Sequence, residues 1–373
     1  MIAALVVAML SLGGGSALAA PLASQTDRKL DRALDRLVRA DEGPPGAIAV
    51  VQRGKRREVH AAGVADLRTE ALLRVSKRMR IASVSKAFSG ATALSLVDEG
   101  VLSLDDTIGD RLPDLPTPWH PVTLRQLLGH TSGLPDFTAT PGFGEAVNAA
   151  PALAPPPREL LGFVEDRPLE FPPGSAFRYS NSDNIAVALM IEAATAAPYA
   201  HVLWAKVLAP LELGRTLIPP GILLPRPFIH GFAPEEDPPE DVSQLVAFGG
   251  WAWASGGIVS TPGELNRFVR GYVGGRLLSA SVRRQQRQLV AGTSEPPGPG
   301  RNAAGLAIFR YRTKCGTLFG HTGSILGYTQ LIASTRDGRR SLTFTITSQV
   351  SDELLPQLRR AQSRAVCAAL ARG

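Results

Sequence analysis

The chain has 373 residues, of which 44% are hydrophobic and 20% are charged, and this balance excludes a largely disordered protein. A chain of this length can form one large domain or two interleaved domains. The formal net charge is +7, yet the basic residues are scattered and no nucleic-acid-binding motif accompanies them. We therefore expect no nucleic-acid partner, and the charge fits an exported protein that acts near an anionic cell wall or membrane surface.

The first twenty residues are typical of a signal peptide. Residues 2–12 are apolar, and an A-x-A cleavage site follows near residue 19 or 20, although the usual basic segment is missing. No later stretch has the roughly 18–20 uninterrupted apolar residues that a membrane span needs. We therefore expect residues 1–20 to be a signal peptide and the mature protein to be secreted, with no stable membrane span.

The first part of the mature chain is predicted to contain a helix, a hairpin and a second helix. Residues 26–40 place apolar side chains on one face, which predicts an amphipathic helix. Residues 47–54 and 57–64 are predicted to be two strands joined by a short turn. Residues 84–99 are rich in helix formers and contain no proline, and Gly100 follows where a left-handed C-terminal residue would lie.

The middle of the chain is predicted to be mostly helical, with long loops. We expect residues 138–157 to form a surface loop and residues 217–240, which are rich in proline, to form an extended loop. A further helix is expected to begin after Thr261, with Pro262 at its first position. Shorter helices are predicted at 123–129, 158–166, 185–196 and about 200–209.

The last third is predicted to be rich in strands. Four strands are expected before a final helix at about 352–371, so the helical middle lies between two halves of one sheet. The fold class is α+β: a mainly antiparallel sheet flanked by N- and C-terminal helices, with an inserted, mostly helical domain. We expect a sheet domain of residues 21–82 plus 243–373, a helical domain of residues 83–242, and an active site at their interface. The four strands are predicted at 305–312, 317–323, 328–335 and 341–348.

The chain contains two cysteines, Cys315 and Cys367. They are either two unpaired buried thiols or one disulfide, and export to an oxidising compartment favours the disulfide. In the chain-entropy model such a link over about fifty residues would stabilise the protein by roughly 4 kcal/mol.

Ser83 and Lys86 form a Ser-x-x-Lys pattern at the start of a predicted helix. A spacing of three residues places both side chains on one helix face, so the lysine ammonium can reach the serine hydroxyl. A helix N-terminus also directs free N–H groups at an oxyanion that forms there. A nucleophilic serine needs both features, although a capping serine followed by a surface lysine would give the same short pattern.

Two further motifs distinguish a nucleophilic serine from an ordinary capping serine. Tyr179-Ser180-Asn181 lies between two predicted helices, and His321-Thr322-Gly323 lies in a predicted strand. In order and spacing, the three motifs resemble those of the penicillin-recognising serine hydrolases, which include class C β-lactamases, D-alanyl-D-alanine carboxypeptidases and related esterases. The segments TLRQLLGHTSGLPDF (123–137), FPPGSAFRYSNSDN (171–184) and LAPLELGRT (208–216) are similar to recurrent segments of the same superfamily.

The resemblance implies a catalytic role for three residues. Ser83 would attack the scissile carbonyl and form an acyl-enzyme. Either neutral Lys86 would accept its proton, or charged Lys86 would keep Tyr179 anionic as the base. Tyr179 would relay the proton to the leaving amine.

The same resemblance implies the binding residues. Asn181 would hydrogen-bond the substrate's side-chain amide, and His321 would tune Tyr179 through a partial positive charge. Thr322, followed by Gly323, would hydrogen-bond the substrate's terminal carboxylate. The backbone N–H groups of Ser83 and Ser324 would form the oxyanion hole. Trp251 is expected either to wall the pocket or to be an ordinary core residue.

Within the superfamily, His-Thr-Gly as third motif and the cysteine pair are similar to exported serine D-alanyl-D-alanine carboxypeptidases. The resemblance therefore implies a carboxypeptidase that acts on D-Ala-D-Ala stem peptides and is acylated by penicillin. One departure stands against it: Phe309 occupies the place of the arginine that binds a terminal carboxylate, and the neighbouring Arg310 faces the other side of the strand. The alternatives are an esterase or β-lactamase with the same catalytic residues, and a non-catalytic ligand-sensing relative.

Other classes of site lack their sequence patterns. The Gly-x-Ser-x-Gly motif of α/β-hydrolases is absent, and the six histidines form no HExxH or His/Cys cluster. The chain also has no glycine loop with an adjacent lysine for a phosphate group. We therefore expect no metal and no cofactor, a small-molecule or peptide substrate, and a monomer.

Overall fold

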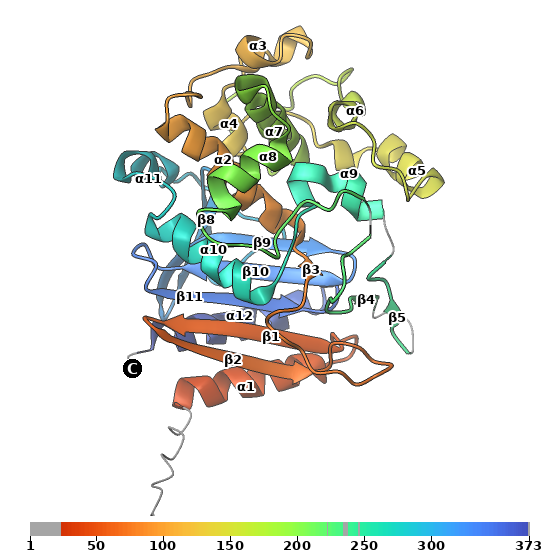
Figure 1. The fold of residues 1–373 in the computed structure, drawn as a ribbon, viewed down its shortest axis with the longest axis vertical. Helices are drawn as coiled ribbons and strands as arrows, with labels where there is room; N and C mark the ends of the chain where they lie inside the picture. The colour runs from red at the N-terminus through yellow and green to blue at the C-terminus, as the bar shows by residue number, and fades with distance from the viewer. Residues whose placement is uncertain (1–23, 222, 234–237, 245–246, 372–373) are drawn as a thin grey trace, which may run out of the picture.

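The computed structural model describes residues 24–221, 223–233, 238–244 and 247–371. The predicted signal peptide of residues 1–20 lies outside these ranges, so export and secretion stay predictions. The centre of the fold is a seven-stranded sheet with the strand order β2-β1-β11-β10-β9-β8-β7 (Figure 1). Its strands are β1 (Gly46–Arg53), β2 (Arg56–Gly63), β7 (Arg301–Gly305), β8 (Ile308–Thr313), β9 (Gly316–Ile325), β10 (Tyr328–Ser334) and β11 (Arg340–Ile346).

The two ends of the chain meet inside this sheet. β1 pairs antiparallel with β11, from Ala47 opposite Ile346 to Arg53 opposite Arg340. β1 is buried over nearly its whole length, because strands flank it on both sides and helices cover both faces. The prediction of an α+β fold with one mainly antiparallel sheet, built from both ends of the chain, is therefore confirmed.

Two helices cover one face of the sheet. They are α1 (Gln25–Val38) and α12 (Leu355–Leu370). α1 begins at a capping box, in which Ser24 and Asp27 satisfy each other's backbone N–H groups. Its leucines at 30, 34 and 37 are fully buried against the sheet and α12. This spacing of three and four residues is the apolar stripe that predicted the helix.

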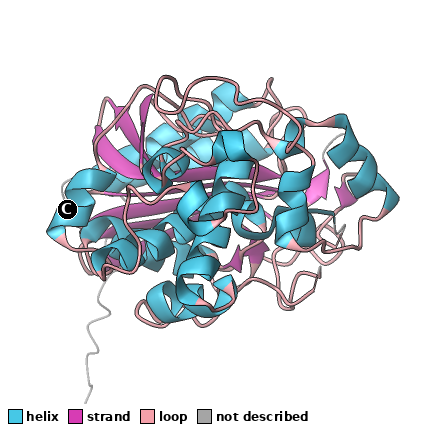
Figure 2. Ribbon diagram, turned by 90° about the horizontal axis from the view of Figure 1, so that it is seen from above, coloured by secondary structure: helices cyan, strands magenta, loops and turns pink. Residues whose placement is uncertain are grey.

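The other face carries the remaining helices (Figures 1 and 2). α10 (Pro262–Gly274) lies directly on the sheet, and α2 (Ser85–Asp98) is buried among the helices of the middle of the chain. In the described residues no single helix is long and apolar enough to span a membrane. By length and composition only, the helices Asn181–Thr195 and Tyr199–Leu208 reach that length together, and they are bent by 86° relative to each other. The other helices are α3 (Ile108–Arg111), α4 (Leu124–Leu128), α5 (Pro141–Ala149), α6 (Pro157–Gly162), α7 (Asn181–Thr195), α8 (Tyr199–Leu203), α9 (Ala247–Gly256) and α11 (Ala280–Gln286).

Two local predictions were wrong. The single strand expected at 305–312 is the end of β7, a tight turn and β8, because Ala307 adopts a φ of +50° and reverses the chain. The surface loop expected at 138–157 contains α5, whose N-cap Thr140 accepts a hydrogen bond from the Phe143 N–H at 3.2 Å. The proposed boundaries between a sheet domain and a helical domain, at 82/83 and 242/243, stay predictions.

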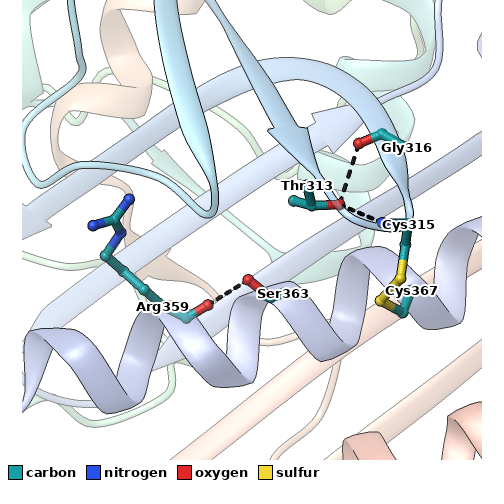
Figure 3. Close-up of a disulfide and its surroundings, with 6 residues drawn as sticks. All are labelled: Thr313, Cys315, Gly316, Arg359, Ser363 and Cys367. Carbon is teal, nitrogen blue, oxygen red and sulfur yellow. Dashed lines mark hydrogen bonds between the residues drawn. A yellow bond between two sulfur atoms is a disulfide. The ribbon is translucent and has the colours of Figure 1, made fainter.

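A disulfide joins Cys315 to Cys367, as export favoured (Figure 3). Cys315 lies in the turn between β8 and β9, and Cys367 lies on α12, with 5.2 Å between their Cα atoms. The Thr313 hydroxyl accepts a hydrogen bond from the Cys315 N–H at 3.2 Å and stabilises the same turn. The disulfide therefore links the sheet to the C-terminal helix, and its two cysteines are 52 residues apart in the sequence.

We expect the double variant Cys315→Ser/Cys367→Ser to lose about 4 kcal/mol of unfolding free energy, because the unfolded chain regains the freedom of the open loop. The turn lies about 26 Å along β9 from Gly323, at about 3.3 Å per residue, so kcat/KM should change less than two-fold. Urea unfolding of the oxidised wild type and the double variant measures the difference. Equal unfolding midpoints would contradict a stabilising role.

Candidate active site

Ser83 lies on a tight turn between a short strand and α2. β3 (Met79–Arg80) pairs with β6 (Val259–Ser260), and a single 3₁₀ turn, Ala82–Val84, follows. Ala82 has a φ of +50°, a strained conformation for a residue with a Cβ. α2 then begins at Ser85, whose hydroxyl accepts a hydrogen bond from the Ile258 N–H at 3.2 Å. The turn holds Ser83 half-buried at the base of a pocket.

Lys86 lies in the first turn of α2, three residues after Ser83, and its buried side chain points at Ser83. Its Nζ donates to Ser83 Oγ at 3.1 Å, to Asn181 Oδ1 at 2.7 Å and to the Ser255 carbonyl at 2.7 Å. The side chain is 1% exposed. Burial lowers the pKa of Lys86 to about 7, although the nearby carboxylates of Asp136 and Glu295 oppose this shift. A large fraction of Lys86 is therefore neutral at neutral pH and able to accept a proton.

Tyr179 lies beside this pair. The Lys86 Nζ is 5.0 Å from the centroid of the tyrosine ring, and the tyrosine side chain is 7% exposed. Within the described residues, its buried hydroxyl has no hydrogen-bond partner of good geometry. Burial raises the pKa of Tyr179 well above its ordinary value; the Ser83 hydroxyl opposes the shift, and the carboxylates of Glu295 and Asp136 add to it. The phenol is therefore protonated at neutral pH.

Asn181 is held between Lys86 and Asp136, a residue to which the sequence analysis assigned no role. Asp136 Oδ2 accepts from Asn181 Nδ2 at 2.9 Å and from the Asn181 backbone N–H at 3.0 Å. Thr138 Oγ1 accepts from the same Nδ2 at 3.0 Å. Both ends of the Asn181 amide are thus engaged, and its oxygen is turned toward Lys86. Asp136 lies in the segment 123–137, which is similar to a recurrent segment of the superfamily. That similarity was the sequence signal that could have pointed to a role for Asp136.

A buried pair supports the ring of Tyr179 from behind. The His130 ring centroid lies 4.5 Å from that of Tyr179, and His130 Nδ1 lies 2.9 Å from Asp183 Oδ2. Ser132 donates to the other oxygen of Asp183. Burial lowers the pKa of His130 to about 3, so its ring is neutral at neutral pH, and burial raises the pKa of Asp183 well above its ordinary value.

The structure changes two roles expected in the third motif. Burial lowers the pKa of His321 to about 3, so its ring is neutral at neutral pH and cannot supply the expected positive charge to Tyr179. The Thr322 hydroxyl donates to the Pro296 carbonyl at 2.6 Å and does not line the pocket beside Ser83. The expected contact of Thr322 with a substrate carboxylate is therefore not supported.

Gly323 lets the third motif pack closely against the turn that carries Ser83. A Cβ at position 323 would lie 2.7 Å from the Ile81 carbonyl oxygen and 2.9 Å from the backbone N of Ser83. These distances are too short for any side chain, so only glycine allows this approach of strand β9. The neighbouring Ser324 lines the pocket and is half-buried, and its hydroxyl lies 3.0 Å from that of Thr329.

The pocket beside Ser83 has a volume of about 330 Å³. Phe143 and Trp251 form an edge-to-face pair with 5.8 Å between ring centroids, so Trp251 both lines the pocket and packs in the core.

Phe309 packs against Tyr179 and His321, and Arg310 does not line the pocket. Among the described residues that line it, none is a lysine, arginine or histidine, and Glu295 is the one carboxylate. The pocket is lined by Ala82, Ser83, Thr138, Phe143, Tyr179, Asn181, Trp251, Ala252, Ser255, Gly256, Glu295, Ser324, Ile325, Leu326 and Gln349.

Among the described residues, one group of side chains has the spacing of a metal site. Ligand atoms of Asp27, Glu58 and His60 lie within 4.8 Å of one another. However, the Arg53 guanidinium donates to Asp27 Oδ1 at 3.0 Å and also pairs with Glu58. Since both carboxylates already have a counter-charge, this group is not a good cation site.

A serine in contact with a buried lysine, at the junction of an antiparallel sheet and a helical layer, is the arrangement of a serine hydrolase of the β-lactamase and penicillin-binding type. The family model described as Beta-lactamase matches residues 30–366. The chain therefore belongs to the Beta-lactamase family.

Proteins from three organisms show what else the chain is similar to. Penicillin-binding protein 4* of Bacillus subtilis is 27% identical over 180 residues, which are 46% of this chain and 38% of the relative. A D-aminopeptidase of Brucella anthropi is 34% identical over 177 residues, or 47% of this chain and 32% of the relative. The matches thus span less than two fifths of either curated relative. The structure of a D-stereospecific amidohydrolase from Streptomyces sp. superposes with a TM-score of 0.76 at 29% identity, covering 88% of this chain and 97% of that one.

Proposed function

We propose that this serine hydrolase is an amidohydrolase that cleaves amides of D-amino acids through an acyl-enzyme at Ser83. One observation carries the proposal: no cationic side chain lines the described part of the pocket, so a free terminal carboxylate has no counter-charge there. An amide substrate needs none. The names of the Brucella and Streptomyces proteins, both of which act on D-configured substrates, support the same class.

Acylation begins with attack of Ser83 Oγ on the amide carbonyl. Neutral Lys86, whose Nζ is 3.1 Å from that oxygen, takes the proton as the C–O bond forms. Its pKa of about 7 suits a base that works near neutral pH, whereas the raised pKa of Tyr179 disfavours the phenolate. The backbone N–H groups of Ser83 and Ser324 are the proposed donors to the tetrahedral oxyanion.

The leaving group departs with a proton. The C–N bond breaks as the protonated phenol of Tyr179 donates to the departing nitrogen, and Lys86 re-protonates Tyr179. Ammonia or an amine leaves, and the acyl group stays on Ser83. Water then attacks the ester and gives up a proton to the same groups, which return it to Ser83 Oγ as the C–O bond breaks and the carboxylic acid leaves.

The carboxypeptidase expected from the third motif and the disulfide stays a prediction. The neutral His321, the Thr322 hydroxyl bound to Pro296, and Phe309 at the place of the arginine all stand against it. The aromatic pair of Phe143 and Trp251 instead offers an apolar wall for a substrate side chain. The monomeric state also stays a prediction.

We expect the purified protein to release ammonia from D-phenylalanine amide at least ten-fold faster than from the L-amide. Release of D-alanine from a peptide ending in D-alanyl-D-alanine should be at least ten-fold slower than release of ammonia from the D-amide. Coupled assays for ammonia and for D-alanine measure these rates, and Ser83→Ala serves as the blank. Faster D-alanine release would establish the carboxypeptidase, and turnover of benzylpenicillin without amide cleavage would establish a β-lactamase.

A further inference from the structure

Glu295 is an acidic group at the rim of the Ser83 pocket that the reaction steps above do not use. Its side chain is exposed and lines the pocket together with Ser83, Tyr179 and Asn181. It makes no hydrogen bond or ion pair to another described residue. The buried carboxyl groups Asp27 and Asp183, by contrast, are bound by arginine, serine or histidine. The free carboxylate in a pocket therefore calls for an explanation.

The backbone on both sides of Glu295 is fixed. Ser294 is fully buried, and its hydroxyl lies 3.2 Å from the Tyr311 hydroxyl and 3.2 Å from the Pro296 carbonyl oxygen. The same Pro296 carbonyl accepts the 2.6 Å hydrogen bond from Thr322. The third motif thus anchors the loop that carries Glu295, which gives the Thr322 hydroxyl a role without substrate contact.

Asn302 holds the rest of this loop. Its side-chain oxygen accepts from the Gly298 N–H at 2.9 Å, and its Nδ2 donates to the carbonyls of Gly298 and Gly300 at 3.2 and 3.1 Å. The backbone around Glu295 is therefore preorganised, and a ligand can bind its carboxylate with little ordering of the loop.

Glu295 is not the counter-ion of Lys86. The Lys86 Nζ makes its three hydrogen bonds to Ser83, Asn181 and Ser255, so no N–H direction remains for Glu295. The carboxylates of Glu295 and Asp136 nevertheless raise the pKa of Tyr179 and oppose the fall in the pKa of Lys86. Both negative charges thus act inside the catalytic centre, and a bound cation would be stabilised there.

We propose that Glu295 binds the α-ammonium of the substrate, so that the enzyme selects amides whose amino group is free. The proposal rests on the amidohydrolase function above. The ammonium lies two bonds from the carbonyl carbon that Ser83 attacks, so a carboxylate at the pocket rim can reach it while the acyl group is in place. A substrate with a free carboxylate instead of the ammonium would be repelled by the same group.

The test compares D-phenylalanine p-nitroanilide with its N-acetyl analogue at pH 7, where an α-amine with a pKa of about 7.7–8.0 is mostly charged. Glu295→Gln keeps the shape of the side chain and removes its charge. We expect kcat/KM for the free amine to fall roughly ten-fold, mainly through KM, and kcat/KM for the N-acetyl analogue to change less than two-fold. Glu295→Asp should retain part of the preference. Glu42→Gln, at an exposed glutamate in the turn after α1 that does not line the pocket, is the matched control.

An equal loss on both substrates, or no loss on either, would overturn the assignment of Glu295. A separate measurement keeps this outcome distinct from failure of the amidohydrolase function. The hydrolysis of p-nitrophenyl acetate reports the acylation of Ser83, and D-phenylalanine amide should inhibit it more strongly than the N-acetyl amide does. If the amide is not cleaved, this competition still tests Glu295, since the difference should disappear in Glu295→Gln.

Discussion

The variant Ser83→Ala should lose kcat/KM for the D-amide by on the order of 10⁴-fold or more, because no other group can form the acyl-enzyme. The fold should stay intact, since the Ser83 hydroxyl contacts the side chains of Lys86 and Tyr179 and no backbone group of a helix or strand. Intact mass spectrometry after brief exposure to benzylpenicillin gives an independent readout. We expect one penicilloyl group on the wild type at high penicillin concentration, since the missing counter-charge weakens binding of the penicillin carboxylate without blocking attack by Ser83, and none on the variant.

Ser95, a serine of α2 outside the site, is the control for this experiment. Ser95 donates to the Ala91 carbonyl at 2.9 Å and lies three turns along the helix from Ser83. Ser95→Ala should therefore change kcat/KM less than two-fold and keep the penicilloyl adduct. An adduct that persists in Ser83→Ala would place the nucleophile elsewhere and reject the site. Unmodified wild type with consumed penicillin would instead mean that deacylation is fast.

The fold could be predicted from the sequence where periodicity and turn chemistry agree. The leucine stripe of α1 and the proline-free run of α2 gave these helices to within about two residues. The split of residues 305–312 into β7 and β8 was missed because the turn uses Leu306 and Ala307 without glycine or proline. Helix α5 was missed because its sequence is rich in glycine and alanine, and a helix there depends on tertiary packing.

The site was predictable in its residue types but not in its electrostatics. The Ser-x-x-Lys spacing placed Ser83 beside Lys86, and the resemblance to the penicillin-recognising serine hydrolases placed Tyr179 and Asn181 beside them. Whether His321 carries a charge depends on burial by segments distant in sequence, and this burial is what lowers its pKa. Glu295 belongs to no motif, and only the folded chain brings it into the pocket.

The identity of the base can be tested by the pH dependence of kcat/KM. If neutral Lys86 takes the proton, kcat/KM should rise with pH and reach half its maximum near pH 7, because the lowered pKa leaves the amine neutral above that value. The profile should be measured with p-nitrophenyl acetate, which has no ionisable group of its own. Lys86→Met and Lys86→Arg should each lose roughly 10³-fold, since methionine has no amine and arginine stays charged.

The variant Glu295→Gln tests whether the group that sets this pH profile lies close to the carboxylate of the pocket. The Glu295 carboxylate opposes the fall in the pKa of Lys86, so its removal should move the half-maximum to lower pH without loss of the plateau rate on p-nitrophenyl acetate. A phenolate base at Tyr179 predicts a different pattern: its raised pKa would place the half-maximum well above pH 7, and Lys86→Arg would keep much of the activity because the positive charge remains. The position of the wild-type half-maximum and the activity of Lys86→Arg together decide which residue is the base, because Glu295 raises the pKa of both groups and its removal lowers the half-maximum in either case.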